Sequence, residues 1–158
     1  MLDILVVLIV AGLLIYALKR AGVGGPSLEE TKAAGQAFLD QNAEKEGVEV
    51  LESGLQILRL EGASDGPKPA VTDQVRVHYE GSLIDGTIFD SSIKRGQPID
   101  FGLNQVIPGW TEGLQLMSVG EKARLFLPSD LAYGNRRAGN IPGGSVLIFE
   151  VELIAINA

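Results

Sequence analysis

The sequence predicts an α+β fold, with an antiparallel β-sheet of about five strands wrapped around one short α-helix. Residues 75–80 alternate apolar and polar side chains, which is the period-two pattern of a strand with one buried face. The dipeptide Asp85-Gly86 stands between two apolar pairs and is a strong signal for a tight hairpin turn. The apolar residues at positions 110, 114 and 117 fall on one face of a short helix. We expect a hydrophobic helix and a short linker helix before this domain.

The first 20 residues contain a strongly apolar segment. Residues 4–18 carry no charge, and Lys19 and Arg20 follow at once. A membrane-spanning helix needs about 20 apolar residues, but Leu2 and the long stems of the two basic residues extend this shorter run. A cleaved signal peptide would need a basic leader and a small-residue cleavage site, whereas this leader carries Asp3. We therefore interpret residues 1–20 as a transmembrane anchor, or as an uncleaved signal-like segment.

Residues 21–47 are predicted to form a linker with a short amphipathic helix. The stretch 22–26 is rich in glycine and reads as a flexible joint. Ser27 and Glu30 have the spacing of a capping box, and a helix is expected over about 28–44, ended by Gly47. Its apolar stripe is thin, so the helix needs packing on its own domain or on a partner helix.

The remaining strands complete a domain that is expected to span residues 48–158. Residues 48–60 alternate and predict one strand, followed by a turn-forming loop at 62–70. A strand is also predicted at 121–127, with Ala123 and Leu125 on one face and Phe126 on the other. The apolar run at 145–156 predicts a central strand that is covered on at least one face.

Composition excludes several kinds of function. The net charge is −7 and no cluster of Lys and Arg interrupts it, so nucleic acid is not an expected partner. The chain has no cysteine, which excludes disulfides and thiolate chemistry, and its one histidine excludes a His-rich metal site. The stretch 75–110 contains no nucleophile–base pair and no cluster of metal ligands. We expect neither a metal nor a cofactor, and a site in this stretch would work by shape and desolvation.

Several separated motifs occur in a fixed order between residues 53 and 157. They read VHYEG, DGTIFDSS, VIPGWTEGLQLMSVGEKARLFLPSDLAYG, IP and LIFEVELI. In this the chain resembles the FKBP-type peptidyl-prolyl cis/trans isomerases, particularly the bacterial members. The resemblance implies an isomerase that binds proline in an apolar aromatic pocket and assists protein folding near a membrane. Its implied partners are proline-containing polypeptide clients, with macrolide inhibitors as further ligands. The helix at 28–44 is shorter than the dimerisation arms of some relatives, so we expect a monomer.

The resemblance also marks the site residues. The expected catalytic residues are Tyr79, Phe89, Asp90, Trp110, Tyr133 and Phe149, and the expected substrate-binding residues are Val106, Ile107, Ile141, Phe101 and Ile99. Trp110 is expected to be a flat floor for the proline ring, and the Tyr133 hydroxyl is expected to donate to a substrate carbonyl. Taken singly, each aromatic residue in a β-rich domain is more often a core residue than a pocket residue.

Two features depart from the family pattern. Ile99 stands where eukaryotic relatives often have an aromatic pocket residue. The loop after Tyr133 is short, carries Arg136 and Arg137, and has Pro-Gly-Gly in place of a more usual second proline.

The alternative function is a non-catalytic chaperone or peptide-binding module tethered to the membrane. Retention of all six expected catalytic residues favours the enzyme.

The charges beside the apolar segment predict its orientation. Lys19 and Arg20 lie on the domain side, and Asp3 lies on the other side. The positive-inside rule therefore predicts an anchor in a bacterial inner membrane with the domain facing the cytoplasm. Many bacterial relatives with an amino-terminal hydrophobic segment resemble periplasmic folding helpers, so the periplasm is the alternative location.

Overall fold

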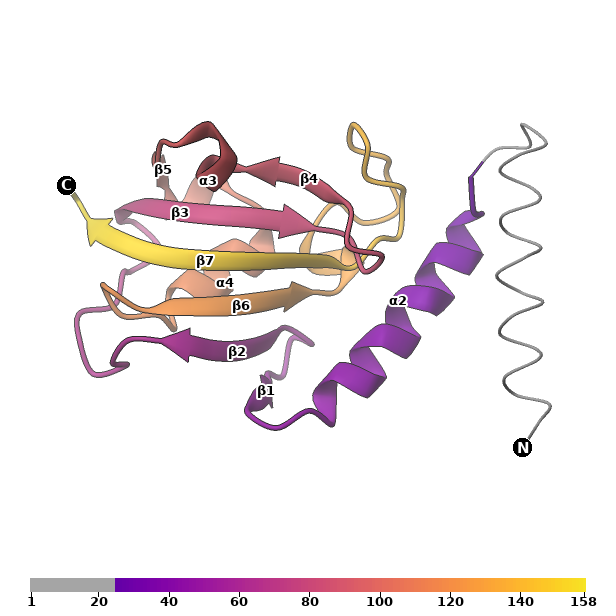
Figure 1. Ribbon diagram of the computed structural model, residues 1–158, viewed down its shortest axis with the longest axis horizontal. Helices are drawn as coiled ribbons and strands as arrows, with labels where there is room; N and C mark the ends of the chain where they lie inside the picture. Colours follow the sequence, from indigo (N-terminus) through magenta and orange to yellow (C-terminus); the bar gives the residue numbers. More distant parts are fainter. Residues whose placement is uncertain (1–24) are drawn as a thin grey trace.

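The computed structural model describes residues 25–158, which form one antiparallel sheet with helices on both of its sides (Figure 1). The elements in chain order are α2 (Leu28–Ala43), β1 (Val48–Val50), β2 (Gln56–Glu61), β3 (Gln74–Ser82), β4 (Ile88–Ser91), α3 (Ser92–Arg95), β5 (Ile99–Gly102), a 3₁₀ turn (Leu103–Gln105), α4 (Pro108–Leu114), β6 (Lys122–Leu127), a second 3₁₀ turn (Ser129–Leu131) and β7 (Leu147–Ile156). The predicted α+β class is confirmed.

The sheet has seven strands in the order β1-β2-β6-β7-β3-β4, with β5 also paired to β3. Strands β3 and β7 lie side by side in its middle (Figure 1). One of the two strands beyond the expected five arises at the edge of the sheet next to β3. The long strand β3 pairs with β5 along Gln74–Val77 and with β4 along Glu80–Ser82, so two short strands share one edge position.

The segment 48–60 is two strands, and the prediction of one continuous strand is wrong. The chain turns back between β1 and β2, where the Leu51 N–H donates to the Leu55 carbonyl at 2.8 Å. Gly54 occupies the turn with a φ of 94°, in the left-handed region that glycine adopts without a steric penalty. Leu55 and Ile57, two residues apart, are both fully buried, which is the spacing of one strand face.

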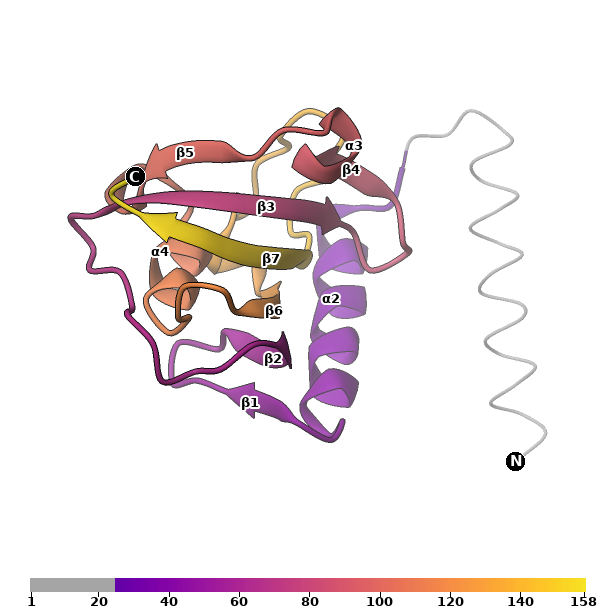
Figure 2. The same ribbon diagram turned by 60° about the vertical axis from the view of Figure 1, so that its left-hand side comes forward.

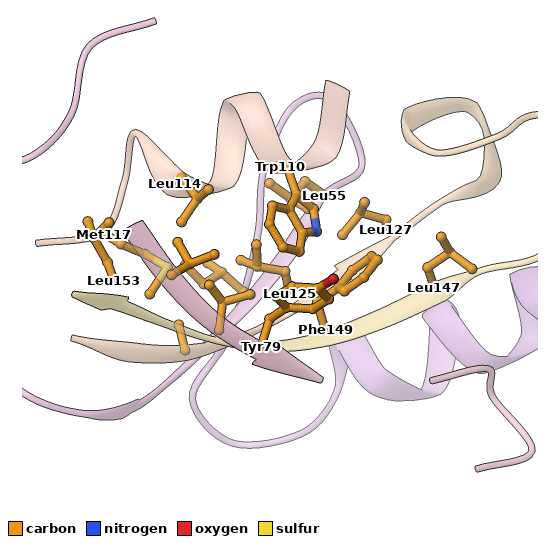
Figure 3. Close-up of a cluster of buried hydrophobic side chains, with 14 of the residues drawn as sticks. Leu55, Tyr79, Trp110, Leu114, Met117, Leu125, Leu127, Leu147, Phe149 and Leu153 are labelled. Atoms are coloured by element: carbon orange, nitrogen blue, oxygen red, sulfur yellow. The ribbon is translucent and has the colours of Figure 1, made fainter. Parts of the chain in front are cut away.

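The main core lies between the sheet and α4. Leu114 and Met117 from the helix segment and Leu125 and Leu153 from the sheet are completely buried. Figure 3 shows these side chains in one cluster, with the aromatic rings of Tyr79, Trp110 and Phe149 in its middle. Ala123 and Leu125 belong to this core, whereas Phe126 faces the opposite side of the sheet, so the predicted facing of β6 is confirmed.

Helix α2 covers that opposite side. The Ser27 hydroxyl caps the helix by accepting the Glu30 N–H at 3.2 Å, which confirms the predicted start. Leu39 packs on Phe126 and Val146 in a second apolar cluster. The helix therefore docks on its own domain, and Figure 2 shows it at the far side of the sheet from α4.

The hydrophobic helix expected at residues 1–20 lies outside the described residues. Within residues 25–158, no helix combines the length and the hydropathy required to cross a membrane.

Candidate active site

A cavity of about 610 Å³ opens between α4, the strands β3, β4 and β5, and the loop after β6. The structure brings ten of the eleven expected site residues to it, namely Tyr79, Phe89, Asp90, Ile99, Phe101, Val106, Ile107, Trp110, Tyr133 and Phe149. Ile141 is the exception. Its side chain is 6% exposed and belongs to the main core, so it supports the loop and does not line the cavity.

The floor of the cavity is the indole of Trp110. Pro108 begins α4, where its missing N–H is no loss, and this places Trp110 in the first turn of the helix. The indole meets the ring of Tyr79 at 5.0 Å and 83° and the ring of Phe149 at 5.0 Å and 86° (Figure 3). Edge-to-face packing of this kind is favourable and fixes the rings relative to one another. The floor is therefore rigid as well as apolar.

The wall formed by Phe89 and Phe149 depends on a glycine. The two rings meet edge-to-face at 5.5 Å. A Cβ atom on Gly81 would lie 2.7 Å from both Phe149 Cε1 and Phe89 Cζ, which is closer than real carbon contacts. The sequence analysis did not identify Gly81, although it stands inside the quoted motif VHYEG.

The polar side of the cavity is a cluster of three side chains. The Tyr79 hydroxyl donates a hydrogen bond to Asp90, and the Arg95 guanidinium forms an ion pair with the same carboxylate. Arg95 Nη2 also donates to the Tyr79 hydroxyl at 3.2 Å. Sequence reasoning missed Arg95, because it lies outside the quoted motifs. It is the last residue of the short helix α3, which begins just after Asp90.

This cluster shifts the pKa values of its members. Burial alone raises the pKa of Asp90, but the hydrogen bonds from Tyr79 and Arg95 and the charge of Arg95 outweigh it, so the pKa is lowered overall. Burial, followed by the hydrogen bond to Asp90, raises the pKa of Tyr79. At neutral pH the cluster therefore consists of an anionic Asp90, a neutral Tyr79 donor and a cationic Arg95.

The rim of the cavity offers hydrogen-bond donors. Tyr133 is 43% exposed, and its hydroxyl contacts no polar atom of the described residues. The N–H of Ile107, which precedes α4, likewise donates to no carbonyl within residues 25–158. Gln105 lines the rim and was not predicted, because it belongs to a polar stretch outside the quoted motifs.

His78 lies behind the cavity wall. Its polar position in the strand favours a solvent-facing side chain, but its Nδ1 lies 2.6 Å from the Ser92 hydroxyl in a partly buried contact. Helix α3 folds over this face of β3, and Ser92 Oγ also accepts the Tyr79 N–H at 2.7 Å. Ser92 thus fastens the backbone of Tyr79.

In residues 25–158 no group of acidic or His side chains is arranged to hold a metal ion.

Comparison with known proteins identifies the family. A family model described as FKBP-type peptidyl-prolyl cis-trans isomerase matches residues 66–154. The chain belongs to the FKBP-type isomerase family. A second model, described as the domain amino terminal to FKBP-type peptidyl-prolyl isomerase, matches residues 22–57.

The most similar FKBP-type proteins include several bacterial ones. The chain is 58% identical over 127 residues to the isomerase FkpA of Aeromonas hydrophila, covering 80% of this chain and 47% of that protein. It is 57% identical over 125 residues to the FKBP-type 22 kDa isomerase of Escherichia coli, covering 78% and 60%. It is 49% identical over 139 residues to the outer membrane protein MIP of Legionella longbeachae, covering 87% and 59%. The chain thus spans about half to three-fifths of the length of these relatives.

Solved structures of FKBP-type proteins share the fold. A crystal structure of a peptidyl-prolyl cis-trans isomerase from Pseudomonas syringae matches with a TM-score of 0.78 and 41% identity, covering 85% of this chain and 99% of that one. The crystal structure of FkpA from Escherichia coli gives the same TM-score and identity, covering 82% and 60%. The sheet around α4 is therefore the FKBP fold.

Proposed function

We propose that this protein is a peptidyl-prolyl cis/trans isomerase that accelerates rotation about X–Pro bonds in polypeptide clients. The observation that carries the proposal is a cavity with an aromatic floor, aromatic walls and a single ordered polar side. The relatives at 58% and 57% identity are named as isomerases of this type. We assign the proline ring to the floor formed by Trp110, with Phe89 and Phe149 beside it.

The proposed mechanism follows from the bond that rotates. An X–Pro bond isomerises in tens to hundreds of seconds, because resonance gives the amide partial double-bond character. Twisting the amide removes this resonance and makes the amide less polar than the planar ground state. An apolar cavity therefore stabilises the twisted amide more than the planar one, which is the differential binding that lowers a barrier.

We assign the polar groups to orientation of the substrate. The free N–H of Ile107 and the hydroxyl of Tyr133 are donors for the two carbonyls that flank the proline. Asp90 and Arg95 hold the Tyr79 ring at the cavity wall through the contacts described above. Rotation about the amide breaks no covalent bond and transfers no group or electron, so we propose a reaction without a cofactor.

An isomerisation assay with a matched pair of variants tests the proposal. Phe89 lines the cavity, whereas its neighbour Ile88 is 38% exposed and does not line it. We expect the full chain to accelerate isomerisation of a short Leu-Pro peptide, and Phe89→Ala to reduce kcat/KM by about tenfold or more, which corresponds to about 1.4 kcal/mol. Ile88→Ala should retain the activity of the unmodified chain, and rapamycin should inhibit both active proteins.

Two outcomes would overturn the proposal. An unchanged rate for Phe89→Ala would remove the cavity from the mechanism. A folded protein that binds proline peptides without accelerating their isomerisation would instead be a peptide-binding module.

We also propose that residues 2–20 tether a monomeric domain to a membrane. The apolar run at 4–18 supports the tether, and one relative is named an outer membrane protein. The flanking charges favour the cytoplasmic face of the inner membrane, whereas the name of that relative favours the far side of the inner membrane. Protease digestion of intact spheroplasts separates the two locations, because only a domain outside the cytoplasm is cleaved.

A further inference from the structure

A closed loop borders the cavity directly after Tyr133. We name residues 134–144 the basic hairpin. Its two ends meet where the Gly144 N–H donates to the Gly134 carbonyl at 2.8 Å, and Ala138 and Ile141 exchange two hydrogen bonds at 3.0 and 2.8 Å. A Cβ on Gly143 would lie 2.3 Å from the Asn135 carbonyl oxygen, so the two limbs run in direct contact. The backbone of the basic hairpin is therefore held closed by its own hydrogen bonds.

The basic hairpin is positively charged in a negatively charged protein. It contains Arg136 and Arg137, both exposed, and no acidic residue occurs between Asp130 and Glu150, although the whole chain has a net charge of −7. Arg137 Nε donates to the Gly139 carbonyl at 3.2 Å, which holds its stem against the loop. The Arg136 side chain forms no hydrogen bond or ion pair with the described residues. Its charge is available to a ligand.

The opposite border of the cavity is also basic. Helix α3 ends in Lys94 and Arg95, both exposed. The acidic residue on the cavity wall is Asp90, and its charge is balanced by Arg95. Lys94 and the two arginines of the basic hairpin form no ion pair within residues 25–158.

The position of the basic hairpin places it on the path of a bound chain. Tyr133, at its base, lines the cavity, and Ala138 within it packs on the core that contains Trp110. Figures 1 and 2 both show the loop between β6 and β7 standing beside β4, the strand that carries Phe89 and Asp90. The basic hairpin therefore lies next to the cavity in which we place the proline of a client.

We propose that the basic hairpin selects clients that carry acidic residues within a few positions of the proline. This inference rests on the proposed function, because the client is the molecule that the cavity holds. Exposed charges of this kind raise the rate of encounter and lower KM more than they change the chemical step. We expect each exposed ion pair to change kcat/KM by about two- to fivefold at low salt.

The test uses peptides with one Leu-Pro core whose flanking positions hold Glu, Gln or Lys. For the full chain we expect kcat/KM in the order Glu, Gln, Lys, with differences that shrink at about 0.5 M salt because the charges are screened. Arg136→Glu should reduce or invert the order while leaving the rate on the Gln peptide unchanged. Lys45→Glu is the matched control, since it makes the same change of net charge at an exposed position after α2.

Each outcome is decisive. Equal rates on the three peptides, with normal isomerisation, would overturn the inference and leave the proposed function standing. An equal loss of preference in Arg136→Glu and Lys45→Glu would assign the effect to net charge and also overturn it. No acceleration of any peptide, by protein with an intact circular dichroism spectrum, would instead overturn the proposed function.

Discussion

The aromatic wall of the cavity depends on the absence of a side chain at residue 81. A methyl group there would overlap with the rings of Phe89 and Phe149, at 2.7 Å from each. We predict that Gly81→Ala destabilises the fold by about 1–3 kcal/mol, the usual range for an overpacked core, and displaces the rings enough to reduce kcat/KM by about tenfold. Urea unfolding and the isomerisation assay measure the two effects.

Gly86→Ala separates these effects. Gly86 has a φ of 90° in the hairpin turn, and no atom lies within 4 Å of an added Cβ. This variant should lose stability through backbone strain, by about 1 kcal/mol, and keep its activity. An equal loss of activity in both variants would mean that Gly81 has no special role at the wall.

Asp90 gives the protein a pH-dependent contribution to stability. Its pKa lies below the ordinary value of 3.8, so the carboxylate stabilises the folded state above that pH. The contribution is lost as the pH falls through the lowered pKa, because the protonated acid no longer pairs with Arg95. We predict that Asp90→Asn lowers the Tm at pH 7 and that the difference from the unmodified chain shrinks toward pH 3. The same difference at both pH values would exclude the carboxylate as the cause.

Residue identities predicted most of the residues that line the cavity but not those that support them. The aromatic residues stand in recognisable motifs, and ten of the eleven expected residues reach one cavity. Arg95, Gln105 and Gly81 were missed, because their roles depend on what lies beside them in space. Ile141 shows the converse, since its motif was recognised but its side chain turns into the core.

Helix α2 is held to the sheet by a buried polar contact as well as by apolar packing. Asn42 is 1% exposed, and its Nδ2 donates to Gln56 Oε1 at 2.7 Å, while Gln56 Nε2 donates to the Leu39 carbonyl at 3.0 Å. We predict that Asn42→Ala destabilises the protein by about 1–3 kcal/mol, because it leaves a buried acceptor without a donor. Chemical denaturation measures the change.

The neighbouring residue supplies the control for this contact. Gln41 is exposed on the same helix, and Gln41→Ala should change stability by less than about 0.5 kcal/mol. If Asn42→Ala behaves like Gln41→Ala, water replaces the lost donor and the contact does not fasten the helix.

Elements with strong local signals were predicted well, and elements defined by pairing were not. The Ser27 cap and the Asp85-Gly86 turn are local, and both occur as expected. The alternation over 48–60 did not reveal that the chain reverses at Gly54, because Val48 and Val50 continue the apolar pattern in the sequence although Val50 is 54% exposed. The edge position that β4 and β5 share likewise depends on how both strands pair with β3.

At the scale of the whole molecule, the sheet separates the cavity from α2. We predict that a fragment of residues 47–158, which lacks α2, is less stable than a fragment of residues 27–158 by about 3 kcal/mol or more, because Phe38 and Leu39 no longer cover Phe126. Below its unfolding temperature the shorter fragment should retain the kcat/KM of the longer one. Loss of activity in a folded shorter fragment would show that the two sides are coupled.

The central position of β7 in the sheet affects how the sheet forms during synthesis on the ribosome. Among the described strands of the sheet, β7 comes last along the chain, yet it lies between β6 and β3 and pairs with both along most of its length. Until residue 156 has left the exit tunnel, β2 with β6 and β3 with β4 are separate sheets with exposed apolar faces. The apolar faces of these partial sheets are therefore open to aggregation until β7 is released.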